Sequence, residues 1–279
     1  MKIKNSKLTI FISYFLLFLW CSFTIFALFW IILTSLKDNQ ALFQNVWSLP
    51  KQLHFENYSL IWNTFDLKTY FKNSLIVVPI SVIFILIFAT PAAYALSRAE
   101  FKGKEFLMNF FIMGIGIPII VILIPLYFLL TSLHIIDTMF GLCIIYISVS
   151  LPFSIYLLTG FFQSFPSELE EAAAIDGCTP FQTFMRVVLP ITTPGLITVS
   201  IFNFIGIWNE YLLSMTLTRD EGNRLLSLGV YSIQNSMQYS GNWVGLFAGT
   251  VIVFLPILIF YIFMSERIME GLTLGAVKG

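Results

Sequence analysis

The residues of this chain best suited to chemistry lie in one polar segment, residues 168–190, between two strongly apolar stretches. Small alanine side chains allow another protein to approach closely, and a neighbouring carboxylate can pair with an arginine or a lysine. We therefore interpret the segment as a docking surface, and an ordinary capped surface helix with no partner is the alternative. Its acidic and small residues are Glu168, Glu170, Glu171, Ala172, Ala173, Ala174, Asp176 and Gly177.

Helix signals divide this polar segment into two short helices. Ser167 and Glu170 have the spacing of a capping box at the start of the first helix, where the helix dipole also favours acids. Gly177 is typical of a left-handed helix end. Thr179 and Gln182 form a second capping box around a proline in the first helical position. The pattern predicts two rigid short helices set at an angle.

The rest of the chain positions this segment, and its composition is that of a membrane protein. Hydrophobic residues make up 58% and charged residues 11%, against about 25% charged in a soluble domain. A bilayer core requires about 20 apolar residues per helix, which predicts an all-α polytopic membrane protein. The six predicted transmembrane helices are residues 8–35, 74–96, 106–130, 140–162, 191–213 and 243–265, the first interpreted as a retained signal anchor.

The positively charged residues give the predicted topology. Lysine and arginine concentrate before the first span, between the second and third, and after the sixth: Lys2, Lys4, Lys7, Arg98, Lys102, Lys104, Arg267 and Lys278. The positive-inside rule then places both termini in the cytoplasm. By alternation the polar segment is cytoplasmic, residues 36–72 and 216–242 are external, and the protein is a multi-pass component of the cell membrane.

Several function classes are excluded by what the sequence lacks. Its net charge is zero, so no basic surface invites nucleic acid. The three cysteines and two histidines have no zinc or disulfide spacing, and with the acids they form no catalytic constellation. We therefore predict that the chain is not an enzyme and holds no cofactor. Because it also lacks a phosphate-binding loop, energy for any pumping must come from a partner.

A few polar residues fall within or beside the predicted spans. Asn73, Asn203 and Asn209 are candidates for a substrate cavity or for hydrogen bonds between helices, and the second interpretation is favoured. Glu210 is the one acid in the fifth span. Since a carboxylate at mid-membrane is costly, we expect an interfacial or cavity-lining position. The predicted substrate-cavity residues are Asn73, Asn209 and Glu210.

The polar segment resembles the EAA motif of ABC-importer permeases. Glu171-Ala172-Ala173 is followed after three residues by Gly177, and after nine more by Val187, one further residue and Leu189-Pro190. Valine replaces the usual isoleucine. The resemblance covers nearly the whole chain and is closest to the carbohydrate-uptake, MalG-like family. Other matching segments are 34–37 (TSLK), 73–75 (NSL), 92–98 (AAYALSR), 124–127 (IPLY), 208–210 (WNE) and 271–279 (GLTLGAVKG).

The resemblance implies a type I ABC-importer transmembrane domain that moves a sugar or oligosaccharide. The polar hairpin would be the coupling helix that sits in a cleft of a cytoplasmic ATPase dimer, which uses ATP and Mg. A homologous second permease and an extracellular or periplasmic sugar-binding protein complete the implied complex. The family places the C-terminal tail between the ATPase subunits. The implied ATPase-coupling residues are Glu171, Ala172, Ala173, Ala174, Asp176, Gly177, Leu189 and Pro190.

The predicted domain division follows from these assignments. Residues 1–72 hold the signal-anchor helix and an external loop, residues 73–265 form the five-helix importer domain, and residues 266–279 form the cytoplasmic tail. An ion-coupled secondary transporter is the alternative function. That alternative requires several intramembrane acids or two related halves with broken helices, and the sequence has one marginal glutamate and no internal repeat.

Overall fold

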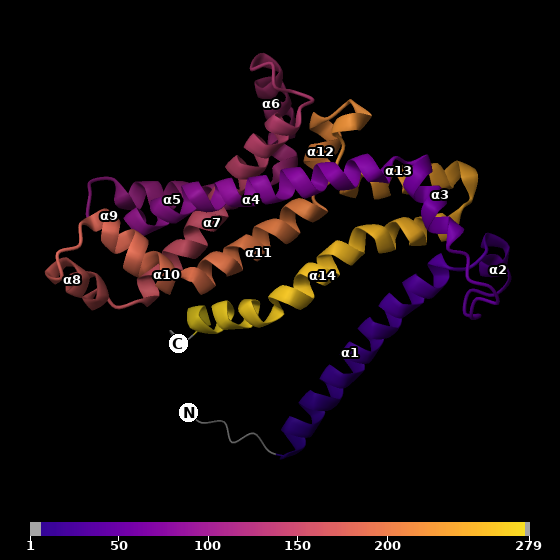
Figure 1. The fold of residues 1–279 in the computed structure, drawn as a ribbon, viewed down its shortest axis with the longest axis horizontal. Coiled ribbons are helices and arrows are strands. Elements are labelled where there is room, and N and C mark those ends of the chain that lie inside the picture. The colour runs from indigo at the N-terminus through magenta and orange to yellow at the C-terminus, as the bar shows by residue number, and fades with distance from the viewer. Residues whose placement is uncertain (1–6, 277–279) are drawn as a thin grey trace. The chain divides into compact units, whose positions relative to one another are not determined.

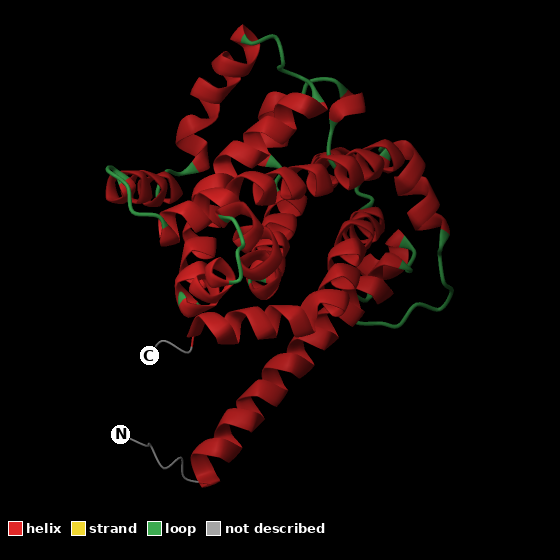
Figure 2. Ribbon diagram, turned by 60° about the vertical axis from the view of Figure 1, so that its left-hand side comes forward, coloured by secondary structure: helices red, strands yellow, loops and turns green. Residues whose placement is uncertain are grey.

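The computed structural model describes the backbone of residues 7–276 and the side chains of residues 7–236 and 241–265. Every regular element in this part of the chain is a helix (Figure 2), as the composition predicted. The elements are α1 (Lys7–Ser35), α2 (Asn39–Gln44), α3 (Glu56–Thr64), α4 (Leu67–Arg98), α5 (Lys104–Ile115), α6 (Ile119–Ser132), α7 (Met139–Ser164), α8 (Glu168–Ile175), α9 (Pro180–Thr183), the π-helical turn η1 (Phe184–Val188), α10 (Leu189–Ile191), α11 (Thr193–Asn209), α12 (Leu212–Leu217), the 3-10 turn η2 (Glu221–Asn223), α13 (Leu226–Ser240) and α14 (Trp243–Ala276) (Figure 1).

Within the described residues, four helices are long and apolar enough to cross a membrane: α1, α4, α7 and α14. The number rises to six if each of two bent helix pairs is one span. α14 continues without a break past the predicted end of the sixth span to Ala276. The predicted C-terminal tail therefore begins as helix, and its last residues, 277–279, lie outside the described residues.

The third predicted span, residues 106–130, is not one continuous helix. α5 and α6 are bent by 102° at the short break between them. Pro118 is the last residue of the break and has an extended backbone, and α6 begins at the next residue. Proline has no N–H to donate and disfavours helical geometry in the residue before it. Gly116 closes α5, so the local sequence accounts for the bend.

The fifth predicted span, residues 191–213, is also interrupted. The helical run Pro180–Ile191 and α11 are bent by 70° relative to each other. Pro194 lies in the first turn of α11, where its missing N–H is tolerated. α11 ends at Asn209, earlier than predicted, because Glu210 adopts an extended conformation (ψ 124°) and α12 begins two residues later.

The chain divides into two compact units, which we describe separately. The first unit comprises the residues up to Leu67 together with Gly229–Leu255. Asn39 fastens its two chain segments: the side-chain amide donates to the carbonyl of Gly241 at 2.7 Å, and the amide oxygen accepts from the N–H of Trp243 at 3.1 Å. Most of α1 is exposed and apolar around its whole circumference, as expected of a helix surrounded by lipid.

The segment after α1 is held by buried polar contacts. Ser35 and Lys37 are almost completely buried. The Lys37 ammonium donates to the carbonyl of Val46 at 2.8 Å and lies 4.5 Å from the centre of the Trp30 ring, while burial lowers its pKa. The Asn57 amide donates to the carbonyls of both Ser35 and Lys37 at 2.9 Å. The end of α1 is therefore a fixed corner of the first unit.

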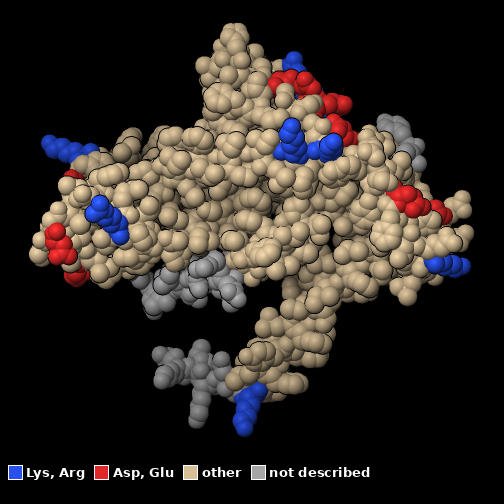
Figure 3. Space-filling model, viewed as in Figure 1, with Lys and Arg blue, Asp and Glu red and all other residues tan. Residues whose placement is uncertain are grey.

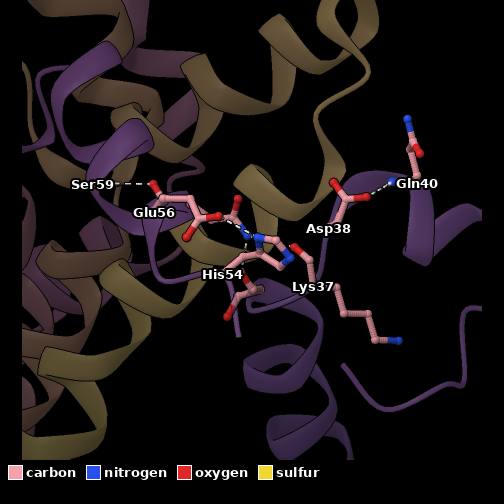
Figure 4. A network of polar contacts seen from close by, with 8 residues as sticks. Lys37, Asp38, Gln40, His54, Glu56 and Ser59 are labelled. Atoms are coloured by element: carbon pink, nitrogen blue, oxygen red, sulfur yellow. Dashed lines mark hydrogen bonds and ion pairs between the residues drawn. The ribbon is translucent and has the colours of Figure 1, made fainter. Parts of the chain in front are cut away.

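The His54 ring lies beside the Glu56 carboxylate in the same region, with 2.5 Å between Nδ1 and Oε1 (Figure 4). This hydrogen bond lowers the pKa of Glu56. The backbone N–H of His54 donates to the carbonyl of Leu36 at 3.0 Å, so the loop that precedes α3 folds back onto the end of α1.

The second unit comprises Lys68–Leu228 and the chain from Pro256 onward, and α7 lies at its centre. α7 packs against α5 and α11. α11 approaches α7 closely at Gly195, where an added Cβ would lie 2.7 Å from the ring of Phe161. The Asn203 amide donates to the hydroxyl of Ser154 in α7 at 2.9 Å and to the carbonyl of Val199 at 2.8 Å. The predicted role of Asn203 in a hydrogen bond between helices is confirmed.

Replacing Gly195 with alanine should destabilise this helix pair. The new methyl group would overlap the Phe161 ring, and overpacking of this kind costs about 1–3 kcal/mol. Gly206 of the same helix is the control, because an added Cβ there meets nothing within 4 Å. We expect Gly195→Ala to lower the free energy of unfolding in detergent and Gly206→Ala to leave it unchanged or raise it. Equal effects of the two substitutions would contradict the packing.

Candidate functional site

The polar segment folds as two helical arms, as its sequence predicted. α8 forms the first arm, and α9, η1 and α10 form the second. The second capping box is confirmed: the N–H of Gln182 donates to the Thr179 hydroxyl at 3.3 Å, and the N–H of Thr179 donates to the Gln182 side chain at 2.8 Å. Pro180 occupies the first turn. Together these contacts fix where the second arm begins.

Gly177 ends α8 in the left-handed conformation that its sequence position predicted. Its φ is +84°, and its N–H donates to the carbonyl of Ala174 at 3.1 Å. The N–H of Cys178 donates to the carbonyl of Ala173 at 2.9 Å. These two bonds form a Schellman motif, which satisfies carbonyls at the helix end. The corner between the arms is thus hydrogen-bonded.

The first predicted capping box, at Ser167 and Glu170, is wrong. Ser167 has helical dihedral angles and its side chain makes no capping bond. The Glu170 carboxylate instead pairs with Arg98, with 2.7 Å between Oε1 and Nε, and accepts from the Tyr94 hydroxyl at 2.7 Å. A guanidinium offers a charge-assisted contact. This contact takes the carboxylate away from the start of its own helix.

The last two turns of α4 therefore hold the hairpin. Arg98 also donates from a terminal guanidinium nitrogen to the carbonyl of Phe165, just before α8, at 2.7 Å. The Tyr94 ring lies between two others, 5.6 Å from the ring centre of Phe162 and 4.8 Å from that of Phe184. These contacts join α4 to α7, α8 and the second arm. No site role was predicted for Tyr94 or Arg98, although both lie in the segment 92–98, and Glu170 was expected to cap its own helix.

The outward surface of the hairpin mixes acidic and apolar side chains. Glu171, Ala172, Ala174, Asp176, Gly177 and Pro190 are exposed, and Leu189 is half-buried. Ile175 is 87% exposed and Phe181 is 70% exposed. Ala173 is the exception, because it is buried within its own chain at 7% exposure and so is not available to a partner as predicted. Figure 3 shows acidic side chains gathered over the region of α8, while the surface over the middle of α4 is uncharged.

The second arm contains a π-helical turn, η1, directly before Pro190. The N–H of Leu189 donates to the carbonyl of Phe184, five residues earlier. Pro190 has no N–H to continue the ordinary helical ladder. The change of direction into α11 follows at Thr192, between the helical run Pro180–Ile191 and α11.

A cavity of about 190 Å³ lies between α7 and α11. Its polar lining comes from Tyr146, Ser150, Asn203 and Glu210. The Glu210 carboxylate accepts from the Tyr146 hydroxyl at 2.8 Å and from the N–H of Leu213 at 2.7 Å. It therefore supports the start of α12 as well as lining the cavity.

The other two predicted cavity residues lie elsewhere. Asn73 is 2% exposed, and its amide donates to the carbonyls of Gly222 and Arg224 at 2.7 and 2.9 Å. Asn209 is exposed and donates to the carbonyl of Ile205 in its own helix at 2.8 Å. The three residues predicted to share a cavity therefore do not come together. Among the residues whose side chains are described, no group of three or more His, Cys, Asp or Glu could hold a metal ion.

Comparison with known proteins gives consistent matches. The family model described as "Binding-protein-dependent transport system inner membrane component" matches residues 83–265. The diacetylchitobiose uptake system permease protein NgcG of Streptomyces coelicolor is 33% identical over 267 residues, covering 96% of this chain and 88% of that protein. The putative ABC transporter permease protein ORF2 of Caldicellulosiruptor is 41% identical over 247 residues, covering 88% and 89%.

The fold also matches a solved structure. The crystal structure of a bacterial ABC transporter involved in the import of the acidic polysaccharide alginate aligns with a TM-score of 0.78 and 22% sequence identity. The alignment covers 95% of this chain and 98% of that one. This likeness shows that the two chains share a fold.

The two ends of the hairpin should respond differently to loss of a hydroxyl. Thr179→Ala removes a capping bond that is present and should cost about 0.5–2 kcal/mol of local stability. Ser167→Ala removes a side chain that caps nothing and should cost close to zero. Amide hydrogen exchange measured by mass spectrometry should speed up in residues 180–184 of the first variant. Faster exchange in residues 168–172 of the second variant would show that the Ser167 hydroxyl does cap α8, which would contradict the structure.

Proposed function

The chain belongs to the family of binding-protein-dependent transport system inner membrane components, and on that premise we propose that it is the permease subunit of an ATP-driven sugar importer. It moves a sugar or oligosaccharide across the cell membrane and is coupled to a cytoplasmic ATPase through the hairpin. The name of the relative NgcG, a permease of diacetylchitobiose uptake, supports the carbohydrate substrate class.

The observation that carries this proposal is the outward surface of the hairpin. Ile175 and Phe181 are large apolar side chains that remain 87% and 70% exposed on the hairpin. Large exposed apolar side chains next to a charged rim mark an interaction site. The exposed Glu171 beside them offers a carboxylate to a basic residue of the partner. The chain contains no phosphate-binding loop of its own.

The proposed complex contains a homologous second permease, a cytoplasmic ATPase dimer that uses ATP and Mg, and a sugar-binding protein outside the membrane. Both chain termini and the hairpin lie in the cytoplasm in this arrangement, as the distribution of lysine and arginine predicts. The C-terminal residues of this chain reach toward the ATPase subunits.

The geometry provides a route from ATP hydrolysis to transport. Closure of the ATPase dimer moves the docked hairpin, whose arms are fixed to each other by the Gly177 corner and the Thr179 cap. The second arm enters α11 through a 70° bend, so movement of the hairpin changes the direction of that span. Bent helix pairs of this kind provide places where a helix can reorient without losing its own hydrogen bonds.

Glu171→Lys should uncouple transport. Glu171 is proposed to pair with a basic residue of the ATPase, so a lysine at this position would repel that residue. Losing one partner of a docked charge pair costs about 2–5 kcal/mol, so sugar uptake and co-purification of the ATPase should fall roughly tenfold or more. Glu100→Lys is the matched control. Glu100 is a 90% exposed acid in the neighbouring turn, and its ion pair with Lys104 is 3.1 Å long.

Membrane insertion of both variants is checked by fractionation and by protease accessibility. Wild-type uptake by the Glu171→Lys protein would contradict the proposed docking. Uptake that continues in ATP-depleted vesicles under an ion gradient would favour a secondary transporter instead.

A further inference from the structure

Helix α4 is fastened at both ends to segments that lie far from it in sequence. Near its C-terminus, Tyr94 and Arg98 bind Glu170 of α8. Near its N-terminus, Asn73 binds the loop that follows α12, and Ser74 binds Leu226, the first residue of α13. All of these residues belong to the second compact unit. Figure 1 shows α4 passing the region of α12 and ending toward that of α8 and α9.

The ion pair between Arg98 and Glu170, which attaches α4 to the hairpin, is more buried than an ordinary surface ion pair. The side chains of Arg98 and Glu170 are 22% and 19% exposed, so water screens the pair only partly. Arg98 lies in the last turn of α4, where the helix dipole favours a cation. Its second bond, to the carbonyl of Phe165 at 2.7 Å, fixes the backbone on the entry side of α8. α8 therefore cannot shift without either moving the end of α4 or breaking a charged contact.

Glu170 and Glu171 have different partners although they are adjacent. Successive residues of an α-helix point about 100° apart. Glu171 is therefore directed to solvent, whereas Glu170 is directed to α4. One acid is available to a partner protein, and the other attaches the same helix to a membrane span.

The attachment at the other end uses the backbone of the loop. Asn73 donates to the carbonyls of Gly222 and Arg224 at 2.7 and 2.9 Å, and the N–H of Leu226 donates to the Ser74 hydroxyl at 2.9 Å. Asn73 and Ser74 are each 2% exposed. Buried hydrogen bonds of this kind hold the loop to the helix, because breaking them leaves polar groups unpaired.

The same loop is fastened to the turn before α7. The Asp137 carboxylate accepts from the N–H groups of Arg219 and Asp220 at 2.8 and 3.0 Å, and the Asn223 amide donates to the Asp137 carbonyl at 2.7 Å. These bonds hold residues 219–224 in one ordered conformation, so we treat the loop as a rigid unit.

The distance between the two attachments matches a membrane. Asn73 and Tyr94 are 21 residues apart (94 − 73), which at 1.5 Å per residue is about 31 Å, close to the 30 Å hydrocarbon core. Between them one face of α4 is buried at regular helical spacing: Val78, Val82, Ile85, Ala89 and Ala93. This face ties α4 to its own unit along its length, so the helix can pass a displacement from one membrane surface to the other.

We propose that α4 is a transmission rod between the coupling hairpin and the loop at residues 219–225. Glu170, Tyr94 and Arg98 are the positioning residues that pass a movement of α8 to α4, and Asn73 passes it to the loop. This inference rests on the proposed function, in which the ATPase moves α8. It assigns to the loop a response to ATP on the opposite side of the membrane.

The experiment measures movement of the loop directly and requires no knowledge of the transported sugar. A nitroxide is attached at Glu221→Cys, a position whose side chain is 76% exposed, after Cys21, Cys143 and Cys178 have been replaced by alanine. The complete complex is reconstituted, and its spin-label spectrum is recorded with and without ATP and vanadate. We expect a spectral change in the otherwise unmodified complex.

Glu170→Gln and Arg98→Gln should each reduce this spectral change to less than a third while the ATPase still co-purifies. The paired substitution Arg98→Glu with Glu170→Arg should restore the spectral change. If the single variants lost it only because the protein was destabilised, exchanging the two charges would not restore it. Glu168→Gln is the matched control, because Glu168 is an exposed acid of the same helix. A response of normal size in Glu170→Gln, or no recovery in the charge-exchanged chain, overturns the inference.

The second attachment is tested with Asn73→Ala, for which Asn209→Ala is the control. Asn73→Ala should also lose the response. The double variant with Glu170→Gln should be no worse than the stronger single variant, because both act through one helix. If the double variant loses more of the spin-label response than either single variant, Asn73 and Glu170 act independently, and the proposal that α4 transmits the movement is overturned. Failure of the unmodified complex to bind the ATPase would instead contradict the proposed function, so the two outcomes are distinguishable.

Discussion

In lipid no water is available to an unpaired backbone group, and this constraint decides where the chain can leave the helical conformation. At two of the breaks a polar side chain bonds to the backbone. At Glu210 the side-chain carboxylate accepts from the N–H of Leu213, the second residue of α12. At Thr192 the hydroxyl donates to the carbonyl of Val188 at 2.8 Å. At these two breaks, side chains of the chain itself therefore support the departure from helical geometry.

The same constraint explains where charge is found. The middle of α4 carries no charged residue, and its lysines and its arginine lie in its outer turns. Arg98 is the charged residue that reaches inward, and it does so with a carboxylate from another helix as its partner. Partly buried charges persist when they are paired and hydrogen-bonded. The pair consequently specifies how α4 and α8 fit together, a role that a purely apolar contact would fill with less precision.

Three segments that were noted in the sequence only because they resemble the permease family have identifiable physical roles in the structure. In the segment 34–37, Ser35 and Lys37 become buried polar anchors of the corner after α1. In the segment 73–75, Asn73 and Ser74 bind backbone groups of a distant loop and of the start of α13. In the segment 92–98, Tyr94 and Arg98 bind the hairpin. In all three segments, polar residues that close or open a span serve to fasten it to other parts of its unit.

The sequence by itself determined the helical class, the two-armed hairpin, the Gly177 corner and the Thr179 cap. These depend on apolar run length and on residues within four positions of each other, which the chain order displays. Only the tertiary structure decided that Glu170 binds α4 rather than capping its own helix, that Ala173 is buried, and that Asn73 and Glu210 lie apart. Glu170 has a distant partner in place of a local one, and Glu170, Asn73 and Glu210 each have a bonded partner that lies more than 60 residues away along the chain. Local spacing identifies a local partner, and folding alone brings a distant one within reach.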